Sequence, residues 1–139
     1  MGKLKKDKGK KTLKADIIKP TNRNNEQVFV SIKEFQNDFE CFSDWSSAEM
    51  SKFWNFNNKL HNATWQQVYS TSSTGANKRG FALTYIPKEN YPSNQFINNL
   101  SEDIKMFELR VDDKMRVHGF RIEQYFYLCY LDREHKICN

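Results

Sequence analysis

The stretch MRVHGFRIEQYFYLCYLDREHKIC, residues 115–138, decides the fold. Side chains alternate between two faces over residues 115–122, which is the period of a β-strand. Glu123 and Gln124 then predict a tight hairpin turn. The run from Tyr125 to Leu131 is apolar on both faces, which is typical of a strand inside a sheet. The sequence therefore predicts a hairpin whose second strand is central.

Two helices are predicted upstream of this hairpin by their start signals. Ser46 and Glu49 have the S-x-x-E spacing of a capping box, which begins a helix that ends near residues 61–62. Thr64 opens a second, shorter helix with another box. Because the link between them is short, we expect an αα-hairpin. The core side of the first helix is expected to carry Met50, Phe53, Trp54 and Leu60.

The alternation of side chains between two faces predicts further strands over residues 28–35, 81–86 and 104–111. We also expect a helical turn over residues 94–100. The order is one strand, two helices and then four strands, which is an α+β pattern. We therefore predict a twisted antiparallel β-sheet packed against an N-terminal αα-hairpin.

The basic charge is concentrated at the N-terminus. The chain has 139 residues and a net charge of +5, yet residues 1–14 alone carry seven lysines and one aspartate. We interpret residues 1–25 as a disordered basic tail and residues 26–139 as a single α+β domain. The tail is either a sequence-independent tether for nucleic acid or a solubilising leader. The nearly neutral domain must bind nucleic acid, if it does, through a local patch.

Several classes of protein are disfavoured. No apolar run approaches the roughly 20 residues of a membrane-spanning helix, and no apolar segment follows the basic N-terminus as in a signal peptide. The three cysteines, Cys41, Cys129 and Cys138, lack C-x-x-C spacing, which argues against a disulfide scaffold or a zinc site. We expect a cytoplasmic protein without a cofactor.

The segment after the last strand, residues 132–136, has the residue types of acid–base chemistry. His135 titrates near neutral pH and lies at the end of a core strand, where its position would be held firmly. Asp132 either orients His135 or caps the turn. His118 and His135 could suggest a metal, but a third ligand is not evident, so we predict none.

Cations and aromatic residues of the late strands suggest an RNA-binding face. Arg110, Arg116 and Arg121 lie on neighbouring strands, where they either hold a phosphate or pair with nearby acids. Arg116 and His118 are expected on one face of their strand, and Arg121 on the other. Tyr127, like the tyrosines on either side of it, either stacks on a base or packs in the core.

The ending LRV…MRVHGFRIEQYFYLCYLDREHK, together with the order of elements, resembles the RelE/ParE-like superfamily of toxin–antitoxin toxins over roughly residues 28–137. It also resembles small phage and mobile-element proteins that end in a similar pattern. The first resemblance implies a metal-independent endoribonuclease that cuts mRNA, often on the ribosome, and that has an antitoxin partner.

The resemblance also implies roles for single residues. His135 would be the acid or base, Arg116 and Arg121 the phosphate clamps, and Tyr127 a stacking or proton-donating group. Arg110, His118, Arg133 and Lys136 would bind the nucleic acid. The alternative is a non-catalytic module of a phage or mobile element that binds nucleic acid or another protein. Its marker would be His135 and Arg121 pointing apart, or arginines paired with acids beside an exposed apolar patch.

Overall fold

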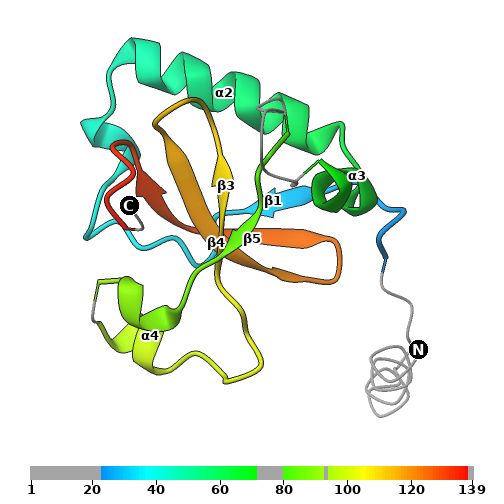
Figure 1. The fold of residues 1–139 in the computed structure, drawn as a ribbon. Helices are drawn as coiled ribbons and strands as arrows, with labels where there is room; N and C mark the ends of the chain where they lie inside the picture. The colour runs from blue at the N-terminus through cyan, green and yellow to red at the C-terminus, as the bar shows by residue number, and fades with distance from the viewer. Residues whose placement is uncertain (1–22, 72–79, 93, 138–139) are drawn as a thin grey trace, which may run out of the picture.

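The computed structural model describes residues 23–71, 80–92 and 94–137, which form one five-stranded sheet with helices on both faces (Figure 1). The strand order is β1-β5-β4-β3-β2, and the pairs β2–β3, β3–β4 and β4–β5 are antiparallel. The bounds are β1 (Phe29–Ser31), β2 (Thr84–Tyr85), β3 (Phe107–Arg110), β4 (Arg116–Ile122) and β5 (Tyr125–Asp132). The predicted α+β class is therefore confirmed.

The sheet is mixed, so the prediction of a wholly antiparallel sheet is wrong at β1. Phe29 lies beside Tyr125 and Ser31 beside Tyr127 in a parallel ladder with β5. The chain leaves β1 at one edge and crosses by way of the helices to β2 at the other edge. A connection of this length permits parallel pairing, which a hairpin cannot make.

Two helices cover one face of the sheet, called here the α2 face. They are α2 (Ser47–His61) and α3 (Trp65–Ser70), and each begins with the predicted capping box. Their buried residues Phe53, Phe56, Leu60, Trp65 and Val68 join Leu109, Val117 and Leu131 of the sheet in one core cluster. Trp54 was predicted to face the core, but it does not join this cluster. The buried side of α2 runs through residues 53, 56 and 60 and leaves Trp54 59% exposed.

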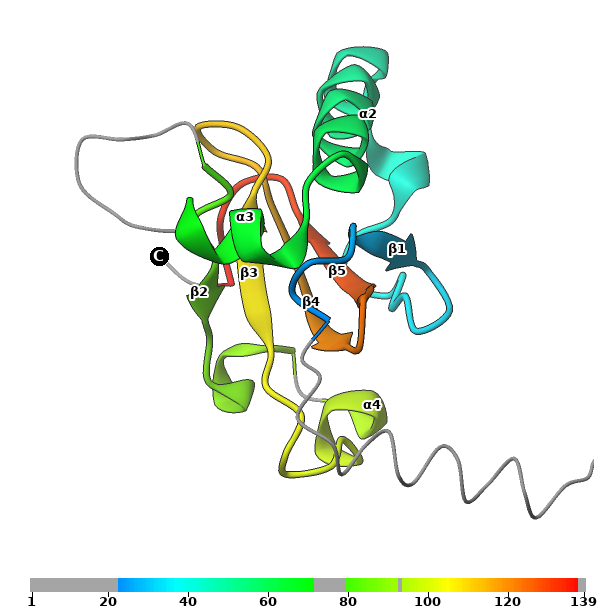
Figure 2. The ribbon, with the colours of Figure 1, turned by 90° about the vertical axis from the view of Figure 1, so that its right-hand side faces the viewer.

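The other face, called the α4 face, is covered in part by α4 (Gln95–Asn98) and the loop that holds the 3-10 helix η2 (Lys88–Asn90). Figure 2 shows α2 and α4 at opposite ends of the view, with the sheet between them. Tyr91 and Ile97 from these segments pack with Phe120 and Tyr130 in a second cluster. A third short segment, the 3-10 helix η1 (Phe42–Asp44), precedes α2.

Three predicted strands are shorter than expected, and β3 covers only Phe107–Arg110 of the predicted residues 104–111. β1 stops at Ser31 because the Ser31 hydroxyl accepts the N–H of Lys33, and Ile32 starts a turn to Phe35. β2 is confined to two residues because Ala82 has a φ of 53°, which lies outside the range of a strand. The 94–100 turn and the β4–β5 hairpin agree with the sequence prediction.

The predicted basic tail lies, except for residues 23–25, outside the described residues. None of the helices that the structure describes is long and apolar enough to cross a membrane.

Candidate active site

The turn after β5 is built on the carboxylate of Asp132. This side chain is fully buried, and its oxygens accept the backbone N–H groups of Lys136 and Ile137, both at 2.8 Å. Burial alone would raise the pKa of Asp132. The close approach of the His118 ring and the hydrogen bonds from these two N–H groups outweigh that effect and lower the pKa below its ordinary value. Of the two roles considered for Asp132, capping the turn is therefore the one observed.

His135 lies in this turn with a φ of 57°, in the left-handed region. Histidine tolerates that region better than most residues, but it remains uncommon and costs backbone energy. The conformation turns the ring back over the sheet, where Nε2 lies 3.4 Å from Oε1 of Glu108 on β3. The His135 side chain nevertheless keeps 30% of its surface exposed, so a ligand in solution can reach the ring.

Four ionisable side chains meet at this end of the α4 face: Glu108, His118, Asp132 and His135, here called the carboxylate–histidine cluster. Glu108 and His118 are cross-strand neighbours, which puts them on one face. His118 Nε2 lies 3.5 Å from Asp132 Oδ2 and 3.9 Å from Glu108 Oε1. The other ring nitrogen, Nδ1, is 2.9 Å from the Tyr91 hydroxyl.

Three atoms in this cluster are buried and lack a hydrogen-bond partner among the described residues. They are Glu108 Oε1, His118 Nε2 and His135 Nε2. Most buried polar atoms in proteins are hydrogen-bonded, because leaving one unpaired costs about 1–3 kcal/mol. A buried polar atom without a partner needs an explanation, and a catalytic role is one such explanation. In the described ranges, no three or more His, Cys, Asp or Glu side chains are arranged to bind a metal ion.

Arg116 borders this cluster. Its Nε lies 3.8 Å from Glu108 Oε2, while Nη1 donates to the backbone oxygens of Asp112 and Met115 at 2.9 and 3.1 Å. The side chain is only 12% exposed, and burial lowers the pKa of its guanidinium. Arg110 is its cross-strand neighbour and donates to the oxygen of Gly80 at 3.2 Å. Both arginines are therefore held in position by backbone groups.

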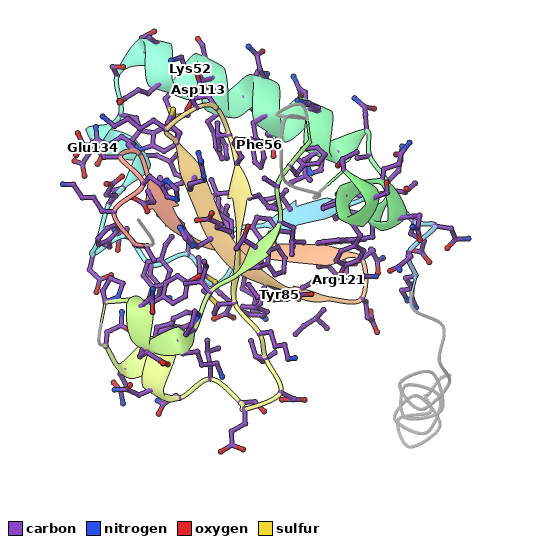
Figure 3. The ribbon with its side chains drawn as sticks, viewed as in Figure 1. Lys52, Phe56, Tyr85, Asp113, Arg121 and Glu134 are labelled. Atoms are coloured by element: carbon purple, nitrogen blue, oxygen red, sulfur yellow. The ribbon has the colours of Figure 1, made fainter. Side chains whose placement is uncertain are left out.

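A groove of about 570 Å³ lies between α2 and the β3–β4 turn. Figure 3 shows Lys52 of α2 close to Asp113 of that turn. Lysines and aspartates are mixed in its lining, and Lys52 pairs with Asp112 at 3.2 Å. Its polar residues are Lys52, Asn55, Lys59, Asp112, Asp113 and Lys114.

Arg121 does not join the cluster. Strand alternation places it on the α2 face, opposite Arg116 and His118. Its guanidinium lies 4.5 Å from the centre of the Trp65 ring and donates to Tyr69 and Asn24. In Figure 3, Arg121 and Glu134, the neighbour of His135, lie at opposite sides of the molecule. The predicted pair of clamps, Arg116 and Arg121, is thus divided between two faces.

The remaining predicted residues are dispersed. Tyr127 is on the α4 face, stacked on Phe120 with ring centres 5.1 Å apart. His118 is fully buried, so it cannot contact a nucleic acid directly. Arg133 is paired with Glu40 and Glu49, each at 3.3 Å, and exposed Lys136 pairs with Glu134 at 3.1 Å.

Sequence reasoning did not identify Glu108 and Tyr91 as site residues. The sequence did contain an indication for Glu108. It lies on the same side of a largely buried strand as Met106, and a buried charged residue needs a partner. Tyr91 lies in an irregular loop before Pro92, and no local pattern predicts its contact with His118.

Comparison with known proteins supplies no relative for this geometry: no family model matches the chain, and no curated protein or solved structure matches it either.

Proposed function

We propose that this chain is a RelE-like, metal-independent endoribonuclease in which His135 is the acid–base group. The observation that carries the proposal is the partly exposed His135 ring, held in a left-handed backbone conformation against Glu108 with Arg116 alongside. An imidazole beside a carboxylate can transfer a proton, and a fixed cation nearby can stabilise a charged phosphate.

The proposed reaction is attack of a ribose 2′-oxygen on the adjacent phosphorus. His135 takes the proton from the 2′-hydroxyl as the new P–O bond forms. The bond from phosphorus to the 5′-oxygen then breaks, and that oxygen takes a proton from a solvent water as it leaves, giving a 2′,3′-cyclic phosphate and a 5′-hydroxyl. Protonated His135 returns its proton to the hydroxide that remains. Arg116 stabilises the charge on the phosphate oxygens in the transition state. Glu108 orients the His135 ring and stabilises its protonated form.

The order of elements supports the RelE-like part of the proposal. One strand precedes two helices on one face, and the later strands form an antiparallel unit that ends beside His135. This is the order on which the resemblance rests. An mRNA substrate, bound to the ribosome or free, and an antitoxin protein are the partners that follow from it.

The test is cleavage of a labelled mRNA fragment by purified full-length protein. His135→Asn is the appropriate variant, since asparagine tolerates the left-handed region while alanine adds strain there. We expect His135→Asn to lower the cleavage rate by about 100-fold or more and the protein to keep its melting temperature. EDTA should leave the wild-type rate unchanged.

Arg121→Ala is the control. Arg121 is a cation on the same strand as Arg116, but it lies on the opposite face of the sheet. Its cleavage rate should stay within a few-fold of the wild type. Cleavage by His135→Asn at the wild-type rate would remove His135 from the mechanism. Absence of cleavage by folded wild-type protein on several mRNAs would refute the nuclease.

A second candidate is a non-catalytic module that binds nucleic acid or protein. Two observations favour it: His135 and Arg121 lie on opposite faces, and Arg133 is engaged by Glu40 and Glu49. The cleavage assay described above decides between the nuclease and this module. The module would bind RNA or a partner protein and would leave the length of the RNA unchanged.

A further inference from the structure

The two ring nitrogens of His135 lie in different surroundings. Nε2 is buried and lies 3.4 Å from Oε1 of Glu108. The side chain as a whole nevertheless keeps 30% of its surface exposed. The exposed part therefore excludes Nε2, and Nδ1 is the only other nitrogen of the ring. A substrate that approaches from solvent can thus exchange a proton with Nδ1 but cannot reach Nε2.

The carboxylate of Glu108 decides which nitrogen of His135 carries the proton. An ionised carboxylate accepts hydrogen bonds and donates none, so a ring nitrogen that faces it is stabilised as N–H. Nε2 faces Oε1 and is therefore the protonated nitrogen of the neutral ring. Nδ1 then keeps a lone pair, which a general base needs. The separation of 3.4 Å is long for a hydrogen bond, but catalytic contacts of this kind often shorten when the substrate binds.

A second histidine faces the same carboxylate. Oε1 of Glu108 lies 3.9 Å from Nε2 of His118, while Oε2 lies 3.8 Å from Nε of Arg116. The same nitrogen of His118 is 3.5 Å from Oδ2 of Asp132. Because His118 Nε2 faces two carboxylates, it is also stabilised as N–H. One oxygen of Glu108 therefore faces the N–H groups of two imidazoles, so a change at one ring alters the partner of the other.

Tyr91 holds His118 from the other side of its ring. The Tyr91 hydroxyl lies 2.9 Å from Nδ1 of His118. With the ring proton on Nε2, Nδ1 accepts a hydrogen bond and the hydroxyl donates it. The Tyr91 ring also stands edge-on to the imidazole, with centres 5.3 Å apart, and stacks on Tyr130 at 5.4 Å. His118 is fully buried, so these contacts determine its orientation.

We propose that His118 is a positioning residue: together with Tyr91 it holds Glu108, and through Glu108 it keeps the proton of His135 on Nε2 and leaves Nδ1 as the base. His118 has no exposed surface, so it acts without contacting the substrate. In the proposed reaction the 2′-hydroxyl gives its proton to Nδ1, while Nε2–H stays on Glu108. This inference rests on the proposed function of His135, but the state of the ring can be measured without RNA.

The experiment alkylates the folded full-length protein with iodoacetamide and determines which nitrogen of each histidine is modified. The reagent is uncharged, so nearby charges do not direct it. Trypsin separates the three histidines into the peptides 60–78, 117–121 and 134–136, and the cysteines, which also react, lie in other peptides. Synthetic peptides that carry the modification on Nδ1 or on Nε2 identify each isomer by chromatography.

In the wild type we expect Nδ1-modified His135 to exceed the Nε2-modified form by about tenfold or more, since one hydrogen bond to a charged group is worth a factor of that size. Fully buried His118 should stay unmodified. Glu108→Ala, which removes the partner of Nε2, should bring the two forms of His135 close to equal amounts. The isomer ratio at His61, whose Nε2 accepts the N–H of Val30 at 3.1 Å, is the internal reference and should stay constant.

Tyr91→Phe and His118→Gln test the positioning role. Each should shift the isomer ratio at His135 toward Nε2 by about threefold or more, because the net contribution of one hydrogen bond corresponds to a factor of that order. Tyr85→Phe is the matched control, since it removes the same hydroxyl from an exposed tyrosine of β2 and should leave the ratio unchanged. Circular dichroism verifies that each variant is folded.

Two outcomes would overturn the proposal. Wild-type protein that is modified mainly at Nε2 of His135, or not at His135 at all, would refute the assignment of Nδ1. An unchanged ratio in folded Tyr91→Phe would refute the positioning role of His118, and this variant decides alone if His118→Gln does not fold. Because no step uses RNA, a wild type that shows the expected isomers and cleaves no mRNA refutes the nuclease and leaves the assignment of the ring in place.

Discussion

At the residue scale, Asp132 fixes the turn that follows β5. A single buried carboxylate ends β5, accepts two backbone N–H groups and faces His118. The turn it fixes is the one that carries His135. The position of His135 therefore depends on an ionised group in the core, which makes this position sensitive to pH.

We predict that Asp132→Asn destabilises the fold by about 3 kcal/mol at pH 7, since hydrogen bonds to a charged group are worth about 1.5–3 kcal/mol each. The folded pKa of Asp132 lies below its unfolded value. Its contribution is therefore complete above the unfolded pKa and is lost as the pH falls through the folded pKa. Urea unfolding from pH 7 to pH 2.5 should show the two proteins converging in acid.

The control for this prediction is Asp113→Asn, the same chemical change at an exposed turn position. It should alter the free energy of unfolding by less than about 0.5 kcal/mol at pH 7. A constant difference between Asp132→Asn and the wild type at every pH would contradict the assignment of the effect to the ionised carboxylate.

At the element scale, the β4–β5 hairpin is shaped by a bulge. The register shifts between His118 and Gly119, and Cys129 is the extra residue on β5. A Cβ added to Gly119 would lie 1.9 Å from the backbone oxygen of Tyr127. Only glycine permits this approach of the two strands, and the bulge changes which residues face the carboxylate–histidine cluster.

Gly119→Ala is accordingly expected to destabilise the protein by at least about 3 kcal/mol, because the clash is with backbone and cannot be relieved by a rotamer change. Thermal unfolding followed by circular dichroism measures the effect. Ile122→Ala, at an exposed position of the same strand, should cost less than about 1 kcal/mol. Equal melting temperatures for Gly119→Ala and the wild type would show that the strands can separate freely at the bulge.

At the scale of the whole molecule, Arg133 joins the C-terminal turn to the segment before α2. It donates to Glu40, to Glu49 and to the backbone oxygen of Asp44. Glu49 is also the capping-box residue of α2, so a single guanidinium connects the start of the long helix with the turn that carries His135. Arg133 therefore has a structural role at this junction.

A double-mutant cycle between Arg133→Ala and Glu40→Ala should give a coupling energy of about 1 kcal/mol, because the Glu40 carboxylate is largely buried. The exposed pair Lys136 and Glu134 is the reference, and its coupling should be smaller because solvent screens the two charges. Both cycles use urea unfolding. A larger coupling for the exposed pair would contradict the structural role of Arg133.

The sequence by itself determined the features that depend on near neighbours. Local spacing predicts both capping boxes and the two-residue turn at Glu123. It also predicts the alternation that puts Arg116 and Arg121 on opposite faces of β4. They could be predicted because a helix cap or a strand face is decided by residues a few positions apart. The same alternation excludes a joint phosphate clamp of Arg116 and Arg121.

Only the tertiary structure decided the parallel pairing of β1, the contact of Tyr91 with His118 and the position of Glu108 beneath His135. Each of these joins segments that are distant in the chain. Such contacts depend on how whole elements pack. They also depend on the left-handed backbone conformation of His135, which no residue pattern in the sequence predicts. The candidate site is therefore a product of long-range packing on a sheet whose strands were largely set locally.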